Sequence, residues 1–145
     1  MRQITPYLVW VGHAGDGQAF REVFDLGIRA IVQLAAEEPT IPAPRELVYF
    51  RFPLMDGTGN DPDVLDLAIR SVEALLQERI PTLVCCGAGM SRSPAVLAAA
   101  LMTVRMTGFD ECLKFVTECR PVDLSSGLFV EIKSAIQRLA LGKPG

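Results

Sequence analysis

One segment of eight residues, 86–93, constrains the fold more than any other part of the chain. It reads Cys-Gly-Ala-Gly-Met-Ser-Arg-Ser and lies between a short apolar run at residues 82–85 and a longer apolar stretch that begins at Pro94. A short apolar run is typical of a buried strand, and a long stretch that is apolar all round is typical of an enclosed helix. The sequence therefore predicts a strand, a tight loop and a helix in direct succession. The loop would leave the carboxyl end of the strand, where open α/β sheets bind their ligands.

The composition of this loop suits a tetrahedral oxyanion such as a phosphate monoester. Gly87 and Gly89 allow the backbone to curl, so that its N–H groups can converge on one point. The N-terminus of the following helix adds unpaired N–H groups and partial positive charge. Arg92 adds a guanidinium that can pair with two oxygens at once. The residues predicted to hold the phosphate are Gly87, Ala88, Gly89, Met90, Ser91 and Arg92.

The same electrostatic field acts on Cys86, whose side chain would lie beneath the bound anion. Helix N-termini and neighbouring arginines favour the thiolate form of cysteine, which is the nucleophilic form. The alternative is that Cys86 is only a small buried apolar residue. A cysteine followed after five residues by Arg92 and then by the Ser93 hydroxyl, between a strand and a helix, is far more specific than a lone cysteine. We therefore predict that Cys86 attacks phosphorus.

The segment resembles the Cys-x5-Arg-Ser/Thr signature of cysteine-dependent protein phosphatases, and its Ala-Gly-x-Ser-Arg-Ser ending is similar to the dual-specificity branch. The resemblance implies that Cys86 is the nucleophile, that Arg92 clamps the phosphate and that Ser93 assists hydrolysis of a phosphocysteine intermediate. Two positions depart from the family. It usually has histidine where this chain has Cys85, and it often has asparagine where this chain has Ser126.

Cleavage of a phosphate ester also requires a proton for the leaving oxygen, and residues 52–62 supply two candidates. Asp61 precedes Pro62 and an amphipathic run, which is the position of a helix N-cap. Asp56 has no such local role, although a turn residue is an alternative interpretation. We predict that Asp56 is the general acid in the first step and the general base for water in the second. In the family that this chain resembles, the acid lies on a similar loop at a similar spacing.

The rest of the chain alternates between strand and helix patterns. The predicted strands are residues 4–11, 29–34, 47–54 and 82–86, and the predicted helices are residues 19–26, 61–79, 92–106, 110–119 and 126–141, with Asp110 as the cap of the fourth helix. Residues 35–44 contain three prolines and predict a loop. This order predicts a single α/β domain over residues 1–145, with a mostly parallel sheet of about five strands and helices on both faces. The resemblance implies the protein tyrosine phosphatase-like fold.

Composition limits the partners and the location. The formal net charge of −3 disfavours binding to nucleic acid, which requires a basic surface. The longest apolar run is too short to span a bilayer, and the N-terminal residues lack the hydrophobic stretch of a secretory signal, so we expect a cytoplasmic protein without membrane contact. The four cysteines include no Cys-x2-Cys pair, and His13 is the only histidine. We therefore expect no metal and no cofactor.

Together these observations predict a phosphate monoester hydrolase, specifically a protein tyrosine or dual-specificity phosphatase that forms a phosphocysteine on Cys86. Its expected partner is a phosphorylated protein or a small phosphate monoester, and we expect a monomer. Two alternatives remain open. One is a phosphate-binding module without turnover, in which Cys86 is too unreactive. The other is an arsenate reductase, for which Cys85, Cys112 and Cys119 would have to supply the resolving thiol.

Overall fold

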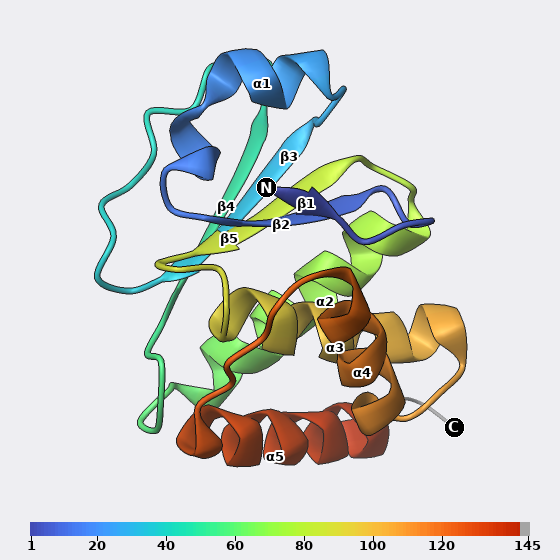
Figure 1. Cartoon of the computed structure of the whole chain (residues 1–145). Coiled ribbons are helices and arrows are strands. Elements are labelled where there is room, and N and C mark those ends of the chain that lie inside the picture. Colours follow the sequence, from blue (N-terminus) through green and yellow to red (C-terminus); the bar gives the residue numbers. More distant parts are fainter. Residues whose placement is uncertain (143–145) are drawn as a thin grey trace.

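A five-stranded sheet forms the centre of the computed structural model, which describes residues 1–142 (Figure 1). The strands are β1 (Arg2–Gln3), β2 (Val9–His13), β3 (Ala30–Ala35), β4 (Val48–Leu54) and β5 (Thr82–Cys86), in the spatial order β1-β2-β5-β3-β4. β1 pairs antiparallel with β2, and the other neighbouring strands pair in parallel. The sheet is therefore mostly parallel, as the sequence predicts.

The strand that precedes the loop, β5, is the middle strand of the sheet. Val84 at its centre lies opposite Val11 of β2 on one side and opposite Val32 of β3 on the other. All five residues of β5 are buried. A strand that is covered on both faces and paired at both edges usually has a continuous apolar sequence, which is the pattern at residues 82–86.

Helices cover both faces of the sheet (Figure 1). One face carries the 3-10 turn η1 (Asp16–Gln18) and the short helix α1 (Phe20–Asp25), and the other carries α2 (Pro62–Gln77), α3 (Arg92–Arg105), α4 (Phe109–Cys119) and α5 (Ser126–Gly142). α3 is enclosed by α2, α4 and α5, and every residue from Arg92 to Leu101 is buried. This enclosure explains why the predicted helix after the loop is apolar all round.

The sequence-based prediction is confirmed for the fold class, for a total of about five strands and, to within a few residues, for the bounds of nearly all elements, although the predicted ranges include only four strands. The prediction of one strand over residues 4–11 is wrong. The chain instead makes the strand β1, a turn and then the strand β2. In the turn, the N–H of Tyr7 donates to the carbonyl of Ile4 at 3.0 Å, and Pro6 has no N–H with which to continue a strand ladder.

The two predicted helix caps have different outcomes. Asp61 is the N-cap of α2, because its side chain accepts a hydrogen bond from the N–H of Asp63 at 2.9 Å and Pro62 follows it in the first turn. The prediction for Asp110 is wrong: α4 begins one residue earlier, at the buried Phe109, and Gly108 occupies the N-cap position. The Asp110 carboxylate instead pairs with Lys133 at 3.1 Å. Within residues 1–142, every helix is too short or too polar to cross a bilayer.

Candidate active site

The loop over residues 87–91 is built against the end of β2. Cys86 is 2% exposed and lies opposite His13 in the parallel pairing of β5 with β2. The N–H of Ala14 donates to the carbonyl of Gly87 at 3.1 Å. Gly89 has φ +72°, and a Cβ at this position would lie 2.6 Å from the carbonyl oxygen of Gly12. Gly89 therefore meets two requirements that only glycine satisfies, a left-handed backbone and a close approach to another strand.

Gly87 is required for a different reason from the one that the sequence suggests. Its φ is not left-handed. A Cβ at Gly87 would lie 3.0 Å from Oε2 of Glu37 and 3.1 Å from Nη2 of Arg92. The absence of a side chain at Gly87 thus makes room for an ion pair beneath the loop.

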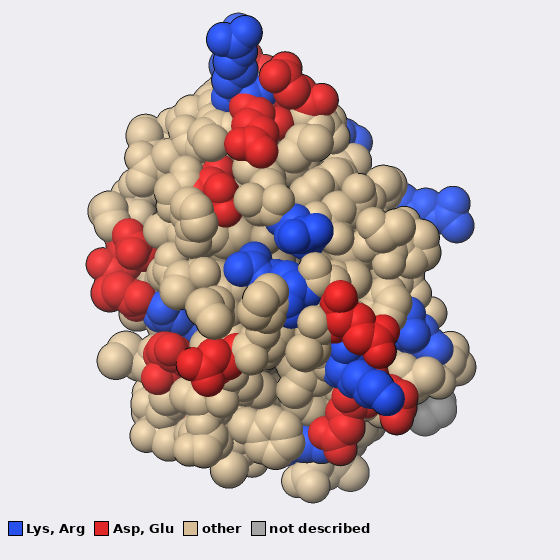
Figure 2. All heavy atoms as spheres, viewed as in Figure 1, with Lys and Arg blue, Asp and Glu red and all other residues tan. Residues whose placement is uncertain are grey.

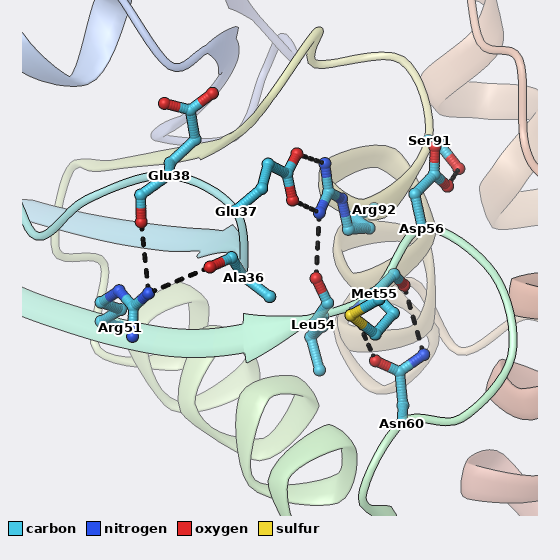
Figure 3. Close-up of polar contacts among 10 residues, drawn as sticks. All are labelled: Ala36, Glu37, Glu38, Arg51, Leu54, Met55, Asp56, Asn60, Ser91 and Arg92. Carbon is cyan, nitrogen blue, oxygen red and sulfur yellow. Dashed lines mark hydrogen bonds and ion pairs between the residues drawn. The ribbon is translucent and has the colours of Figure 1, made fainter.

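This ion pair joins Arg92 to Glu37 in a two-pronged arrangement (Figure 3). Nη1 and Nη2 of Arg92 donate to Oε1 and Oε2 of Glu37 at 2.5 and 2.6 Å, and Nη1 also donates to the carbonyl of Leu54 at 2.9 Å. The hydrogen bonds from Arg92 lower the pKa of Glu37 to about 2, and they raise the pKa of Arg92 above its ordinary value. Within residues 1–142, Nε of Arg92 is buried and has no hydrogen-bond partner. The guanidinium is therefore fixed in orientation while one of its donors stays free for a ligand.

The segment that carries Glu37 is itself held in place by β4. Nη2 of Arg51 donates to the carbonyls of Ala36 and Glu38 at 3.4 and 3.2 Å, on either side of Glu37 (Figure 3). Sequence reasoning missed Glu37. A signal was present, because Glu37 follows the carboxyl end of β3, a strand that lies beside β5 in the sheet.

The structure brings Asp56 to the loop. Asp56 follows β4 and is exposed, and one of its carboxylate oxygens, Oδ1, accepts a hydrogen bond of 2.6 Å from the hydroxyl of Ser91 (Figure 3). The Ser91 oxygen in turn accepts from the N–H of Ser125 at 3.3 Å. A second contact from the same segment, the N–H of Asp123 to the carbonyl of Met90 at 2.7 Å, ties residues 123–125 to the loop. Sequence reasoning missed Ser125.

Ser93 lies in the first turn of α3 and is fully buried, and its hydroxyl has no hydrogen-bond partner within residues 1–142. Cys85 belongs to a different environment from Cys86. It packs in the apolar cluster on the α1 side of the sheet, and burial raises the pKa of its thiol to about 12. Cys112 is also buried and contacts the hydroxyl of Thr107 at 3.2 Å. Among residues 1–142, no three side chains of His, Cys, Asp or Glu gather as a metal site would require.

The molecular surface gives no sign of a broad basic patch on the face that Figure 2 shows. Basic and acidic side chains are interspersed among uncharged residues there, and the basic atoms near the middle of the view form only a small group.

The structure therefore brings a buried thiol, a guanidinium of fixed orientation and an exposed carboxylate to one loop. Residues 9–132 match the family described as dual specificity phosphatase, catalytic domain. A comparison with curated protein sequences finds no match.

Solved structures with the same fold include human DUSP28, with a TM-score of 0.84 and 23% identity over 99% of this chain and 100% of that one. A mouse putative dual specificity phosphatase complexed with zinc tungstate has a TM-score of 0.82 and 26% identity over 97% and 88% of the two chains. The human tyrosine phosphatase-like serine/threonine/tyrosine-interacting protein has a TM-score of 0.80 and 18% identity, over 98% of each chain.

Proposed function

Because this chain belongs to the dual specificity phosphatase catalytic-domain family, we propose that it hydrolyses phosphate monoesters through a phosphocysteine intermediate on Cys86. The observation that carries the proposal is the arrangement around residues 86–92. Within residues 1–142, Nε of Arg92 has no hydrogen-bond partner, and Asp56 is hydrogen-bonded to Ser91 of the loop that joins Cys86 to Arg92. Nucleophile, anion clamp and proton donor are thus supplied by one small region.

In the first step, the thiolate of Cys86 attacks phosphorus and the bond from phosphorus to the leaving oxygen breaks. The loop N–H groups of residues 87–92 and the guanidinium of Arg92 hold the other three phosphate oxygens, where negative charge must be stabilised. Asp56, in its protonated form, gives its proton to the leaving oxygen. The products of this step are an alcohol or phenol and the phosphocysteine.

In the second step, water attacks the phosphocysteine and Asp56, now a carboxylate, takes the proton of that water. The sulfur of Cys86 leaves as a thiolate, and inorganic phosphate is released. The hydroxyl of Ser93, which is buried and has no partner within residues 1–142, is suited to hydrogen-bond to the departing sulfur. The balance of the two steps requires no metal and no cofactor.

We propose a phosphorylated protein or a small phosphate monoester as the substrate, and a monomeric cytoplasmic protein that does not act on nucleic acid. The mouse relative is a complex with zinc tungstate, and tungstate is a tetrahedral oxyanion like phosphate. This supports an oxyanion ligand for the present chain. The formal net charge of −3 supports a local anion site rather than a polyanion-binding surface.

The test is hydrolysis of an aryl phosphate by Cys86→Ser and Asp56→Asn variants. We expect the first to have no detectable turnover, and the second to lose about 10²- to 10⁴-fold, which is the usual contribution of general acid–base catalysis. Cys119→Ser is the matched control, because Cys119 is a partly exposed free cysteine on α4, and it should retain full activity. Turnover by Cys86→Ser would rule out the mechanism.

A binding module without turnover is the second candidate. Two observations favour it: Arg92 already has a partner in Glu37, and Cys86 is 2% exposed. The human relative at a TM-score of 0.80 is named an interacting protein that is tyrosine phosphatase-like. Titration calorimetry with a phosphopeptide, combined with a phosphate-release assay on the same sample, separates the two functions. Saturable binding without release of phosphate would support the module.

A further inference from the structure

The loop that carries Asp56, residues 55–60, is fastened to the last helix of the fold. The carboxylate of Glu131, on α5, accepts three hydrogen bonds from this loop. They come from the N–H of Gly59 at 2.8 Å, the N–H of Asn60 at 3.1 Å and the side-chain amide of Asn60 at 2.8 Å. The partly buried carboxylate of Glu131 thus holds the C-terminal end of a loop that lies about seventy residues earlier in the chain.

The side chain of Asn60, which is bonded to Glu131, is also hydrogen-bonded to the backbone of Met55, the residue before Asp56. Its Oδ1 accepts from the N–H of Met55 at 2.7 Å, and its Nδ2 donates to the carbonyl of Met55 at 3.2 Å (Figure 3). The same Nδ2 also lies 3.1 Å from the carbonyl of Gly57. The loop is therefore closed into a ring by one amide side chain. Because the backbone is fixed on both sides of Asp56, its Cα has little freedom to move.

The backbone of α5 approaches the same loop closely. A Cβ at Gly127, in the first turn of α5, would lie 2.7 Å from Cγ2 and 3.1 Å from the N of Thr58. This contact does not involve Glu131, so it is independent evidence that the loop packs against α5. Because Gly127 has no side chain, the loop can pack this closely against α5.

Glu131 is held as an anion. Partial burial raises the pKa of its carboxyl, but the hydrogen bonds from Asn60 and Gly59 and the nearby charge of Arg138 outweigh burial and lower it. Arg138 is itself fixed by a two-pronged pair with Asp66 of α2, at 2.7 and 3.0 Å. The charged form of Glu131 is therefore the form that accepts the three hydrogen bonds at neutral pH.

The side chain of Asp56 is held from the other direction by Ser91. The Ser91 hydroxyl has a single proton, which it donates to Oδ1 of Asp56 at 2.6 Å, while its oxygen accepts from the N–H of Ser125. With Oδ1 engaged in this way, Oδ2 is the oxygen left to carry the proton for the leaving group. The hydrogen bond thus selects one of the two carboxylate oxygens.

We propose that Glu131 and Ser91 are positioning residues for Asp56, one fixing its backbone through Asn60 and the other fixing its carboxylate. The inference rests on the proposed function, because it assumes that Asp56 donates the proton. It assigns to α5 a role in catalysis without contact with the substrate. Misplacement of a catalytic group by about 1 Å can lower a rate by about 10²-fold, so restraints of this kind have measurable kinetic effects.

Proton donation matters most when the leaving group is a poor one. A strongly acidic phenol departs as its anion without help, whereas a weakly acidic phenol or an alcohol needs the proton. A displaced Asp56 should therefore steepen the dependence of kcat/KM on the acidity of the leaving phenol. A merely structural role for Glu131 would lower kcat/KM equally for every substrate in the series.

The experiment measures kcat/KM for a series of substituted phenyl phosphates with Glu131→Ala, Glu131→Gln and Ser91→Ala variants. For Glu131→Ala and Ser91→Ala, we expect a loss of about tenfold or more on the least acidic phenol and little loss on the most acidic one. Glu131→Gln keeps one acceptor oxygen and should lie between wild type and Glu131→Ala. Glu118→Ala, an exposed carboxylate on α4, is the control and should leave the slope unchanged. Thermal unfolding of each variant checks that it is folded.

Asp56→Asn in the same series separates this inference from the proposed function. If Asp56→Asn itself does not steepen the dependence, Asp56 is not the general acid. If Asp56→Asn steepens it but Glu131→Ala and Glu131→Gln lose activity uniformly or not at all, the positioning role of Glu131 is wrong. If Glu131→Ala fails to fold, the same test is made with Glu131→Gln and Gly127→Ala, since both variants disturb the packing of the Asp56 loop against α5.

Discussion

Cys85 and Cys86 are adjacent in the chain and have opposite surroundings. Cys86 belongs to the larger apolar cluster, beneath the loop on the α2–α5 side of the sheet, whereas Cys85 belongs to the smaller cluster on the α1 side. Successive side chains of a strand point to opposite faces, so one step along β5 is enough to separate them. Burial raises the pKa of Cys85 to about 12, which keeps it a neutral thiol at neutral pH.

The difference shows that the two faces of this sheet serve different purposes. Cys85 is packed tightly against the turn η1, since a Cβ at Gly17 would lie 3.1 Å from its sulfur. The loop that follows Cys86 is held by polar contacts and by the close approach of Gly89 to Gly12. We expect changes on the Cys85 side to alter stability and changes on the Cys86 side to alter activity.

Among variants that leave the catalytic side chains in place, the largest effect is expected from Gly89→Ala, compared with Gly27→Ala on the α1 side. Both glycines have left-handed φ, +72° and +76°, but only at Gly89 would a Cβ meet backbone, at 2.6 Å from the Gly12 carbonyl. Gly27→Ala should cost about 1–2 kcal/mol of unfolding free energy and leave kcat/KM unchanged. Gly89→Ala should displace the loop and lower kcat/KM by about 10²-fold or more.

Steady-state kinetics on an aryl phosphate and chemical denaturation of both variants check this prediction. Equal losses of activity in the two variants would show that left-handed strain, and not the contact with β2, governs the loop.

A smaller effect is expected from Cys85→Ser, which places a hydroxyl in the apolar cluster of Trp10, Ile31 and Leu83. A buried hydroxyl without a partner costs about 1–3 kcal/mol, so the midpoint of urea unfolding should fall while kcat/KM stays close to the wild-type value. The comparison with Cys86→Ser is direct, because that variant should lose turnover, whereas Cys85→Ser should keep it. A loss of turnover in Cys85→Ser would mean that the α1 side also controls the reactivity of Cys86.

The smallest effect is the pH dependence of stability that comes from the pair of Glu37 with Arg92. The pKa of Glu37 is lowered from 4.5 to about 2, so its contribution is fully present above pH 4.5 and is lost as the pH falls towards 2. Because the Glu37 side chain is 57% exposed, we expect the advantage of wild type over Glu37→Gln to be below about 1 kcal/mol at pH 7.

Urea unfolding of Glu37→Gln at several pH values measures that advantage. Glu46→Gln is a matched control, since Glu46 has a similar exposure of 62% and a looser contact of 3.7 Å with Arg45. If the two variants behave alike at every pH, the pair beneath the loop contributes no more than an ordinary surface pair.

The features that could be predicted from the sequence are those written in a few neighbouring residues. The strand β5, the loop at residues 87–91, the start of α3 and the cap at Asp61 all follow from local patterns, and the structure contains each of them. The N-cap of α4 could not be predicted in this way, because Gly108 and Asp110 are both acceptable caps, and the packing of Phe109 decides between them.

The supporting residues of the site could not be predicted, because they come from distant parts of the chain. Glu37 lies 55 positions from Arg92, and Glu131 lies 71 positions from Asn60. Each of them reads as an ordinary charged residue on a loop or helix. Their roles arise from the order of the strands in the sheet and from the packing of α5 beside the loop after β4, neither of which a local pattern encodes.

The contact between Gly89 and the carbonyl of Gly12 also has a consequence for the order in which the chain folds during its synthesis. During synthesis, β2 emerges from the ribosome long before β5, and α5 emerges after both. The loop after Cys86 can begin to form once β5 has paired with β2, but its contacts with residues 123–125 come later, as does the contact of the Asp56 loop with Glu131. A nascent chain would therefore complete both loops only after residues 123–131 have emerged, and turnover by a stalled chain would report that synthesis has passed Glu131.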